Sequence, residues 1–319
     1  MELVDKMLSG SAQALSHLIT LVEKDGPEVP QIMREIYPHL GKAYSIGITG
    51  PPGGGKSTLI DKLTKVARGR GLSAAIIAVD PTSPFSGGAT LGDRLRMQQH
   101  FLDSGVFIRS MATRGSYGGL PWAAHGVMKL LDASGKDIIF VETVGVGQTE
   151  LDIMEAVDTI VVVLYPEAGN AIQTLKAGLM EIADILVVNK ADREGANRLL
   201  AALRARPHLS SEGRGWQVPI LATQTINDVG IEELYQEIER HRGYLESSGC
   251  LLQRRREQTR AEFLKIIKQR LSRQLLQSLK EDKTLAASLG KVESGEIDAY
   301  SAAMEILSNK AHIVAWFQS

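Results

Sequence analysis

Hydrophobic residues rich in valine and isoleucine form seven runs along the chain, and stretches of helix length separate these runs. The runs are YSIGITG (44–50), AAIIAVD (74–80), VFIRSM (106–111), DIIFVET (137–143), TIVVVLYP (159–166), ILVVNKAD (185–192) and VPILATQ (218–224). Because their apolar character is continuous rather than alternating, they indicate strands that are buried on both faces. The helix-length spacers indicate a parallel sheet. We therefore predict an α/β fold with a doubly wound, mostly parallel sheet that binds ligands at the carboxyl ends of its strands.

The segments on either side of these runs have a helical pattern. Residues 1–41 predict two short helices, broken near Asp25-Gly26-Pro27 and near Pro30. Strand signals end after residue 231, and apolar residues then follow a helical spacing. Residues at this spacing include Phe263, Ile266, Ile267, Leu271, Leu275 and Leu279. The pattern predicts an N-terminal helical extension over 1–41, an α/β domain over 42–242 and a C-terminal helical arm over 243–319.

The composition limits the classes of protein to which the chain can belong. Its 319 residues are 44% hydrophobic and 23% charged, enough for one large core and a smaller helical appendage. A net charge of -1 argues against a chain that holds nucleic acid by neutralising phosphates. The single cysteine, Cys250, excludes an internal disulfide. Since no run reaches the roughly 18 apolar residues of a membrane span and no signal-peptide pattern occurs, we expect a cytoplasmic protein without nucleic-acid or membrane partners.

A phosphate-binding pattern, G-x-x-x-x-G-K-[ST], occurs at residues 50–58 (GPPGGGKST), between a predicted strand and a predicted helix. Its glycines let backbone N–H groups approach the phosphates, and the helix N-terminus adds the positive end of its dipole. Lys56 would reach the β- and γ-phosphate oxygens, and the Ser57 hydroxyl would be a ligand for Mg²⁺. The predicted phosphate contacts are Gly50, Gly53, Gly54, Gly55, Lys56, Ser57 and Thr58.

A guanine-binding pattern, N-K-x-D, occurs at residues 189–192 (NKAD), after the sixth run. The Asp192 carboxylate can accept from both the ring N–H and the exocyclic amine of guanine, whereas adenine has no matching pair of donors. Asn189 would tie the loop to the purine edge, and the stem of Lys190 would lie over the ring. The tetrapeptide alone also fits a solvated loop, but its place after a buried strand and downstream of the phosphate loop favours guanine. The predicted base contacts are Asn189, Lys190, Asp192 and, through a backbone N–H after the last run, Ala222 and Thr223.

Three acidic residues stand near the predicted phosphate site. Glu142 directly follows the apolar residues 138–141 of the fourth run, Asp80 ends the second run, and Asp93 lies in TLGDRLRM. With Ser57 they form an oxygen-only set suited to Mg²⁺. Two alternatives remain, since Asp80 also fits a turn before Pro81 and Asp93 also fits the start of a helix. The Glu142 position is usually Asp in P-loop GTPases.

The motifs together resemble one family. GPPGGGKST, VDPTSPFSGGATLGDRLRM, FIRSMATRG, VETVGVGQTE and NKAD occur in the order and spacing of the MeaB/ArgK GTPases, whose animal member is the methylmalonic aciduria type A protein. The resemblance covers nearly the whole chain and implies a P-loop NTPase fold of the SIMIBI type. The family also has Glu at the Glu142 position. We hypothesise that this longer side chain reaches Mg²⁺ through water and leaves the inner contacts to Ser57 and Asp80.

The resemblance implies a partner as well as a reaction. It implies a GTPase, with GTP, GDP and Mg²⁺ as ligands, that attends an adenosylcobalamin-dependent acyl-CoA mutase such as methylmalonyl-CoA mutase. It would gate cofactor loading, help to remove damaged cobalamin and form a homodimer through its C-terminal helices. The cobalamin would sit only on the partner, because this chain has no D-x-H-x-x-G motif. The segment 165–178 resembles the third switch of the family, in which Lys176 is retained but Glu167 and Asn170 replace Gly and Asp.

Hydrolysis of GTP requires neutralisation of the γ-phosphate charge and a water held in line. Lys56 and Mg²⁺ would supply the first. Val146 stands where many signalling GTPases have a water-positioning glutamine, so we expect slow intrinsic turnover that a partner raises. Gln148, which also fits a polar residue at a helix start, and Lys176 are candidates to replace that glutamine. The predicted catalytic residues are Lys56, Glu142, Gln148 and Lys176.

Other functions remain as alternatives. A nickel-type metallochaperone GTPase would have a His-rich tract or a Cys pair, whereas the histidines here are scattered, at 17, 39, 100, 125, 208, 241 and 312. A P-loop small-molecule kinase or transport ATPase would prefer ATP, so Asp192 discriminates between these classes. A basic segment, Arg254–Arg256 with Arg260, Lys265, Lys268, Arg270 and Arg273, has only one aromatic residue, Phe263, among its charges. It favours a solvated helix face or a docking arm over a nucleic-acid surface.

Overall fold

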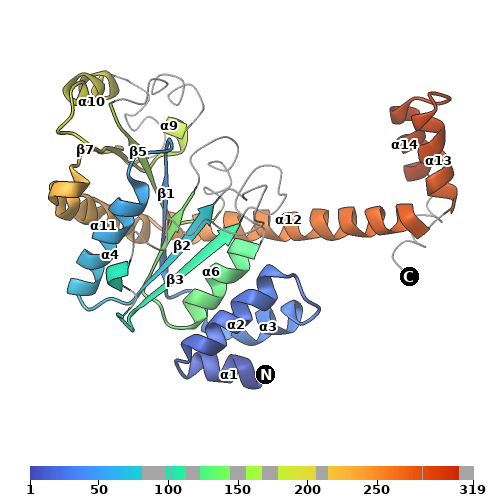
Figure 1. Ribbon diagram of the computed structural model, residues 1–319, viewed down its shortest axis with the longest axis horizontal. Helices are drawn as coiled ribbons and strands as arrows, with labels where there is room; N and C mark the ends of the chain where they lie inside the picture. The colour runs from blue at the N-terminus through green and yellow to red at the C-terminus, as the bar shows by residue number, and fades with distance from the viewer. Residues whose placement is uncertain are drawn as a thin grey trace. The chain divides into compact units, whose positions relative to one another are not determined.

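The computed structural model of the chain describes residues 1–80, 98–100, 102–112, 123–143, 156–166, 179–205, 215–281 and 283–308. The chain divides into two compact units, Met1–Arg256 and Glu257–Ser319. The first unit contains a β-sheet covered by helices on both faces, and the described part of the second is helical (Figure 1).

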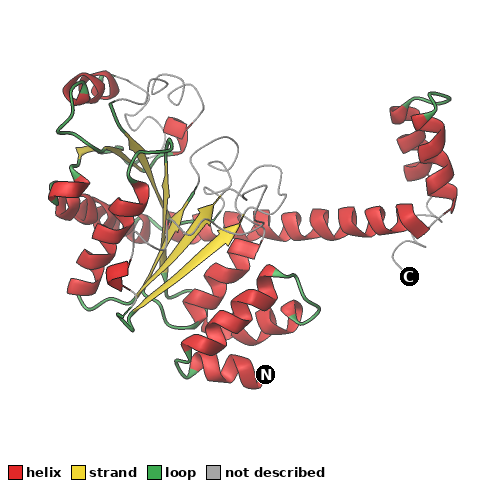
Figure 2. Ribbon diagram, in the orientation of Figure 1, coloured by secondary structure: helices red, strands yellow, loops and turns green. Residues whose placement is uncertain are grey.

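The first unit is built on a seven-stranded sheet in which every strand pairs in parallel with its neighbours (Figure 2). The strands are β1 (Tyr44–Thr49), β2 (Ala74–Asp80), β3 (Val106–Ala112), β4 (Ile138–Glu142), β5 (Thr159–Leu164), β6 (Ile185–Val188) and β7 (Ile220–Ala222). Their order is β3-β2-β4-β1-β5-β6-β7. The predicted parallel α/β sheet is confirmed, and each predicted run contains one strand. Because β1 lies between β4 and β5, the carboxyl ends of these three strands lie side by side at one edge of the sheet.

Helices bury both faces of this sheet. One face is covered by α1 (Glu2–Leu8), α2 (Ala12–Glu23), α3 (Val29–Ile36), α6 (Ala123–Ala133), α9 (Leu179–Ile182) and α10 (Ala196–Arg204), and the other by α4 (Lys56–Gly69) and α11 (Ile231–Ser247). Alternate residues of a strand enter the two cores, so that Ile139 and Val141 of β4 join the first and Ile138 and Phe140 the second. This two-sided burial explains the continuous apolar runs. Within the described residues, the short 3₁₀ helices η1 (Tyr37–His39), η2 (Gln98–His100) and η4 (Thr225–Asn227) lie between the longer elements.

The N-terminal extension packs on the sheet, but the prediction of two helices is wrong, because the extension forms three, α1, α2 and α3. The missed break lies between α1 and α2, where Gly10 has φ 96° and Ser11 begins α2 by accepting the Ala14 N–H at 3.2 Å. Pro30 does not interrupt a helix. It lies in the first turn of α3, where the missing N–H would have no helical partner.

Helices fill the described chain after β7. Gly249, with φ 73°, separates α11 from the long helix α12 (Cys250–Glu281), and α13 (Lys283–Glu293) and α14 (Ala299–Ser308) follow. The predicted helical pattern is therefore present. Apolar side chains that it placed on α12, among them Phe263, Ile266 and Leu271, are exposed in the single chain.

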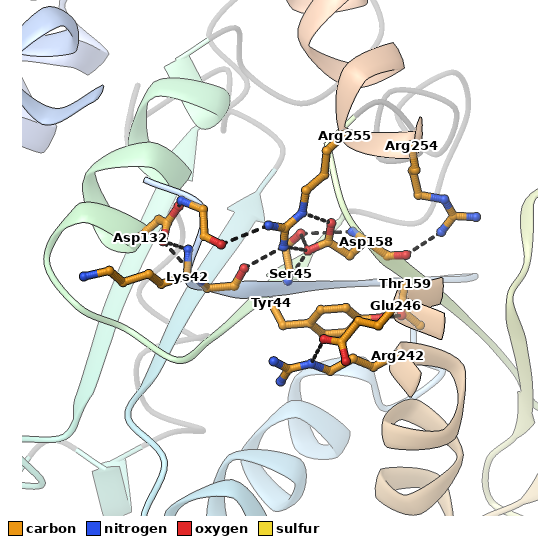
Figure 3. Close-up of polar contacts among 12 residues, drawn as sticks. Lys42, Tyr44, Ser45, Asp132, Asp158, Thr159, Arg242, Glu246, Arg254 and Arg255 are labelled. Carbon is orange, nitrogen blue, oxygen red and sulfur yellow. Dashed lines mark hydrogen bonds and ion pairs between the residues drawn. The ribbon is translucent and has the colours of Figure 1, made fainter. Parts of the chain in front are cut away.

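Two buried aspartates and two partly buried arginines join the start of α12 to the amino edge of the sheet, opposite the carboxyl ends of β1, β4 and β5 (Figure 3). Arg255 donates from Nε and Nη2 to the two carboxylate oxygens of Asp158, both at 2.9 Å. Arg254 donates to both oxygens of Asp184, at 2.8 and 3.0 Å. The two aspartates directly precede β5 and β6, and we name these four residues with His241 the amino-edge cluster. The first two arginines of the basic segment thus bind the sheet and do not lie on a solvated face.

The amino-edge cluster also holds the link between the N-terminal helices and β1. Asp132 of α6 accepts the backbone N–H groups of residues 41–43 at 2.6 to 3.0 Å, while Arg255 donates to the carbonyl oxygens of Gly41 and Ala43 (Figure 3). Asp158 accepts both the N–H and the hydroxyl of Ser45 at 2.9 Å. Segments far apart in the sequence therefore meet at this edge.

His241 of α11 is the most deeply buried member of this cluster, with 1% of its surface exposed. Its Nδ1 lies 2.8 Å from the Thr159 hydroxyl, its Nε2 lies 3.5 Å from an Asp184 oxygen, and its ring packs on Trp216. Burial lowers the pKa of His241 to about 4, although the charge of Asp184 acts in the opposite direction. The imidazole is therefore neutral at pH 7.

Candidate functional site

The phosphate loop, residues 50–55, leaves the carboxyl end of β1 and leads into α4. Gly50 has φ 138°, and a Cβ there would lie 2.0 Å from the carbonyl oxygen of Val163 in β5. Gly55 has φ 85°, and its Cβ would lie 2.5 Å from Nδ2 of Asn189. Glycine at these two positions therefore lets the loop pack closely against the ends of β5 and β6.

Lys56 is the first residue of α4 and is 6% exposed. Its Nζ donates to the carbonyl oxygen of Gly50 at 2.8 Å and to that of Pro51 at 3.2 Å, so the ammonium group lies across the loop. The N-terminus of α4 adds the positive end of its dipole at the same place. The Lys56 ammonium and the positive end of the helix dipole both favour an anion here. Thr58 is partly buried in the same first turn.

An oxygen pair lies beside the phosphate loop. The Ser57 hydroxyl donates to Oε1 of Glu142 at 2.7 Å, and both side chains are buried, at 5% and 8% exposure. One residue further on, the Thr143 hydroxyl donates to that of Thr49 at 2.9 Å, which ties the end of β4 to the end of β1. A hydroxyl and a carboxylate at this spacing match the hard oxygen ligands that Mg²⁺ prefers, so the described residues fit this ion.

Asn189 connects the phosphate loop to the loops after β6 and β7. Its Nδ2 donates to the carbonyl oxygen of Gly54 at 2.8 Å. Its Oδ1 accepts from the hydroxyls of Thr223 and Thr225 at 3.1 and 2.6 Å and from the Thr225 backbone N–H at 3.3 Å. Since a carbonyl only accepts and a backbone N–H only donates, these contacts define the orientation of the amide.

Lys190 and Tyr165 form a second connection between the same loops. Lys190 adopts φ 56°, a left-handed conformation that is uncommon for a residue other than glycine, and its Nζ lies 4.7 Å from the centre of the Tyr165 ring. The Tyr165 hydroxyl donates to the carbonyl oxygen of Pro52 at 3.0 Å. Tyr165 follows β5 directly and is partly buried.

The remaining predicted base contacts, Asp192, Ala222 and Thr223, lie at the ends of β6 and β7 or in the loops that follow them. Asp192 is exposed, as is Ala222 at the end of β7. Thr223 is fully buried, its N–H donates to the carbonyl oxygen of Val188 at 2.9 Å, and its own carbonyl oxygen accepts from Ala191 at 3.0 Å. In this arrangement the Thr223 side chain holds Asn189, while its backbone joins the β6 and β7 loops.

Several predicted residues lie outside the described part of the chain. They are Asp93, Gln148 and Lys176, together with Glu167 and Asn170 of the third-switch segment. For Asp80 the backbone is described, at the end of β2 beside β4, but not the side chain. The roles of these residues stay predictions.

Sequence reasoning missed two residues of this site, Tyr165 and Thr225. Tyr165 lies at the carboxyl end of a buried strand, as Asn189 does, and it begins the third-switch segment 165–178, but neither signal identified its side chain. Thr225 has none, because its partner Asn189 lies 36 residues away and only the fold brings the two together.

Comparison with known proteins places this geometry in a family. A family model described as the methylmalonyl Co-A mutase-associated GTPase MeaB matches residues 15–280. The chain belongs to the MeaB family. Relatives from Pyrococcus abyssi and Escherichia coli are named as GTPases, and this chain is accordingly a P-loop GTPase.

Relatives in this family come from archaea, bacteria and animals. A GTPase of Pyrococcus abyssi is 50% identical over 309 residues, which are 96% of this chain and 95% of the relative. The GTPase ArgK of Escherichia coli is 34% identical over 266 residues, 81% of this chain and 80% of the relative. The mitochondrial methylmalonic aciduria type A homolog of Caenorhabditis elegans is 32% identical over 280 residues, 81% of this chain and 69% of the relative.

A solved structure agrees with the fold. A crystal structure described as a LAO/AO transport system kinase matches with a TM-score of 0.68 and 26% identity, and the match covers 96% of both chains. No helix in the described part of this chain is both long and apolar enough to cross a membrane.

Proposed function

We propose that the protein is a cytoplasmic, GTP-binding and GTP-hydrolysing chaperone for an adenosylcobalamin-dependent acyl-CoA mutase such as methylmalonyl-CoA mutase. It gates the loading of adenosylcobalamin and protects or reactivates the mutase, while the cobalamin stays on the partner. The name of the MeaB family model, which matches residues 15–280, and that of the animal relative both support a mutase as the client.

The observation that carries the nucleotide part of this proposal is the Asn189 side chain, which bonds the phosphate loop and the loops of the predicted base site at once. With 2% of its surface exposed, it sets the separation between the two loops from inside the protein. A ligand that spans them has phosphates at one end and a base at the other. Asp192, three residues further on, is the predicted acceptor for two guanine donors.

The residues at the start of α4 bind the phosphates and neutralise their negative charge. The Lys56 ammonium group lies across the loop carbonyls at a helix N-terminus, where it stabilises the charge that develops on the β- and γ-phosphate oxygens during hydrolysis. Its burial reduces screening by water and so strengthens this attraction.

Ser57 and Glu142 would hold Mg²⁺, together with Asp80 and Asp93 of the predicted set. When bound, this ion neutralises phosphate charge and orients the γ-phosphate. Glu142→Ala should therefore weaken the Mg²⁺ dependence of GTP affinity, measured by titration with and without a chelator. A variant with unchanged Mg²⁺-dependent affinity would contradict this role for Glu142.

The homodimer belongs to the proposal as well. Phe263, Ile266 and Leu271 expose apolar surface on α12, in the unit that follows Arg256, and a second copy of the helix could cover them. Sedimentation at micromolar concentration tests this part, and replacement of these three residues by serine should shift the protein toward monomer.

The main experiment measures GTP hydrolysis by the purified protein alone and with cobalamin-dependent acyl-CoA mutases. We expect slow turnover alone and stimulation by one mutase, with both lost in Lys56→Ala. Lys24→Ala, at an exposed lysine after α2, is the matched control and should behave like the wild type. GTP hydrolysis without a response to any mutase would keep the GTPase and reject the client.

A kinase or transport ATPase is the second candidate, because the solved relative at 26% identity is described as a transport system kinase. Asp192 separates the two. The chaperone proposal predicts a preference for GTP over ATP, and Asp192→Asn should transfer that preference to xanthosine triphosphate, whose C2 oxygen replaces the amine. A wild-type protein that prefers ATP would favour the kinase.

A further inference from the structure

Tyr165 contacts two parts of the nucleotide site that lie far apart in the sequence. Its hydroxyl donates to the Pro52 carbonyl oxygen in the phosphate loop, at 3.0 Å and 113 residues away. The face of its ring lies under the Lys190 ammonium of the base loop, 4.7 Å from the ring centre. The ring also borders the phosphate loop, since a Cβ built on Gly53 or Gly54 would lie 3.5 or 3.6 Å from its atoms.

The Tyr165 hydroxyl bonds the peptide between Pro52 and Gly53, whose orientation determines the shape of the phosphate loop. Residues 51–54 form a β-turn closed by the Gly54 N–H and the Pro51 carbonyl oxygen at 3.2 Å. Pro52 is the second residue of this turn and Gly53, with φ 77°, is the third, which matches a type II turn. Types I and II differ mainly by a flip of the central peptide, here the bond from Pro52 to Gly53.

The Tyr165 hydroxyl selects between these two orientations. In a planar trans peptide the C=O and the next N–H point in opposite directions. A bond from Tyr165 to the Pro52 oxygen therefore directs the Gly53 N–H away from the ring. In a loop that binds phosphates through its backbone N–H groups, this choice decides where one donor points.

The ring contact acts on the other side of the site. Lys190 has a left-handed backbone, which costs free energy unless its surroundings compensate. An ammonium over an aromatic face supplies an attraction of this kind. The Lys190 side chain consequently runs from the base loop toward a ring that is bonded to the phosphate loop.

We propose that Tyr165 is a positioning residue of the GTPase site, which holds the phosphate loop in its type II form and aligns Lys190 with it. This inference rests on the nucleotide site proposed above. Tyr165 acts on the loop and not on the γ-phosphate, so it stabilises bound GTP and bound GDP alike.

Two variants of Tyr165 distinguish its hydroxyl bond to Pro52 from its ring contact with Lys190. Tyr165→Phe keeps the ring and removes the hydroxyl, and we expect about fivefold weaker binding of both nucleotides, the equivalent of about 1 kcal/mol for one hydrogen bond. Tyr165→Leu removes the ring too, and we expect a loss of about tenfold or more. In both variants KM should rise while kcat stays within about twofold of the wild type. Tyr37→Phe, at a tyrosine that is 75% exposed in η1, is the matched control.

A second comparison tests the contact with Lys190. Lys190→Met should weaken nucleotide binding in the wild type and in Tyr165→Phe, but much less in Tyr165→Leu, where the ring is already absent.

Three results would contradict either the role of Tyr165 or the proposed nucleotide site. Nucleotide affinities within twofold of the wild type in both variants would overturn the inference, and so would a lower melting temperature with unchanged affinity. In either case loss of binding in Lys56→Ala would still support the proposed function. A wild-type protein that binds neither GTP nor GDP would instead overturn the proposed function itself.

Discussion

Replacement of His241 by glutamine tests the buried amino-edge cluster through the pH dependence of stability. His241 is 1% exposed, and burial lowers its pKa from the ordinary 6.5 to about 4. Asp184 opposes this shift, while Arg254 and Arg240 add to it. Glutamine has a similar reach and can bond Thr159, but it does not titrate.

The sign of the effect follows from which state binds the proton first. As the pH falls through 6.5 the unfolded chain takes up a proton at this imidazole, whereas the folded protein does so only near pH 4. The stability that depends on neutral His241 is therefore present above pH 6.5 and lost as the pH falls. At about 1.36 kcal/mol per pKa unit the full loss is about 3 kcal/mol, and at pH 5 it is about 2 kcal/mol.

Urea unfolding at pH 7.5 and pH 5.0, followed by tryptophan fluorescence, measures this difference, since Trp216 packs on the His241 ring. Other groups titrate in this range, so the comparison between proteins is what counts. Between the two pH values the wild type should lose about 2 kcal/mol more than His241→Gln. His39→Gln, at an exposed histidine, should match the wild type. Equal pH dependence of wild type and His241→Gln, or an NMR titration of His241 near pH 6.5, would refute the reasoning.

Two further predictions concern glycine and arginine. Gly55→Ala should abolish GTP binding in a filter assay, because the alanine Cβ would lie 2.5 Å from Nδ2 of Asn189. Gly41→Ala is the control, since Gly41 is also left-handed but has open space around it. It should lower the free energy of unfolding by only about 1 kcal/mol and leave GTP affinity unchanged. Arg255→Ala should lower the free energy of unfolding by about 3 kcal/mol, since it leaves the buried Asp158 carboxylate without its bidentate partner. A loss below about 1 kcal/mol in a urea titration would mean that other groups or water compensate that charge.

The sequence predicted the parts of the structure that depend on local pattern. Continuous runs such as Ile138–Val141 identified the inner strands, because burial on both faces requires apolar residues at every position. The edge strands β3 and β7 are only partly buried, and their position between helix-length spacers identified them. The phosphate loop was predictable for a similar reason, since a glycine is needed wherever the backbone turns left-handed or approaches another strand, as at Gly50 and Gly55. The position of Asn189 after a buried strand indicated a base loop.

What the sequence did not reveal depends on contacts between distant segments. Arg254 and Arg255 belong to a basic run that would suit a solvated helix, and nothing local shows that two aspartates of the sheet bind them. Tyr165 is a single aromatic residue after a strand, and its role in the site depends on a hydrogen bond to the Pro52 carbonyl oxygen, 113 residues earlier. The break at Gly10 was missed because a single glycine does not by itself end a helix.

The bonds of Arg255 also constrain the order in which the first unit can fold. This residue lies 97 positions after Asp158 and 214 positions after Gly41, and it bonds both. During synthesis the strands are complete long before the start of α12 leaves the ribosome, so Asp158 and Asp184 then have no arginine partner at the edge of the growing sheet. A fragment ending at residue 242 contains the strands of the sheet but neither arginine, so it would keep both carboxylates in that state. We therefore expect a stable fragment of the first unit to need the two arginines at the beginning of the long helix.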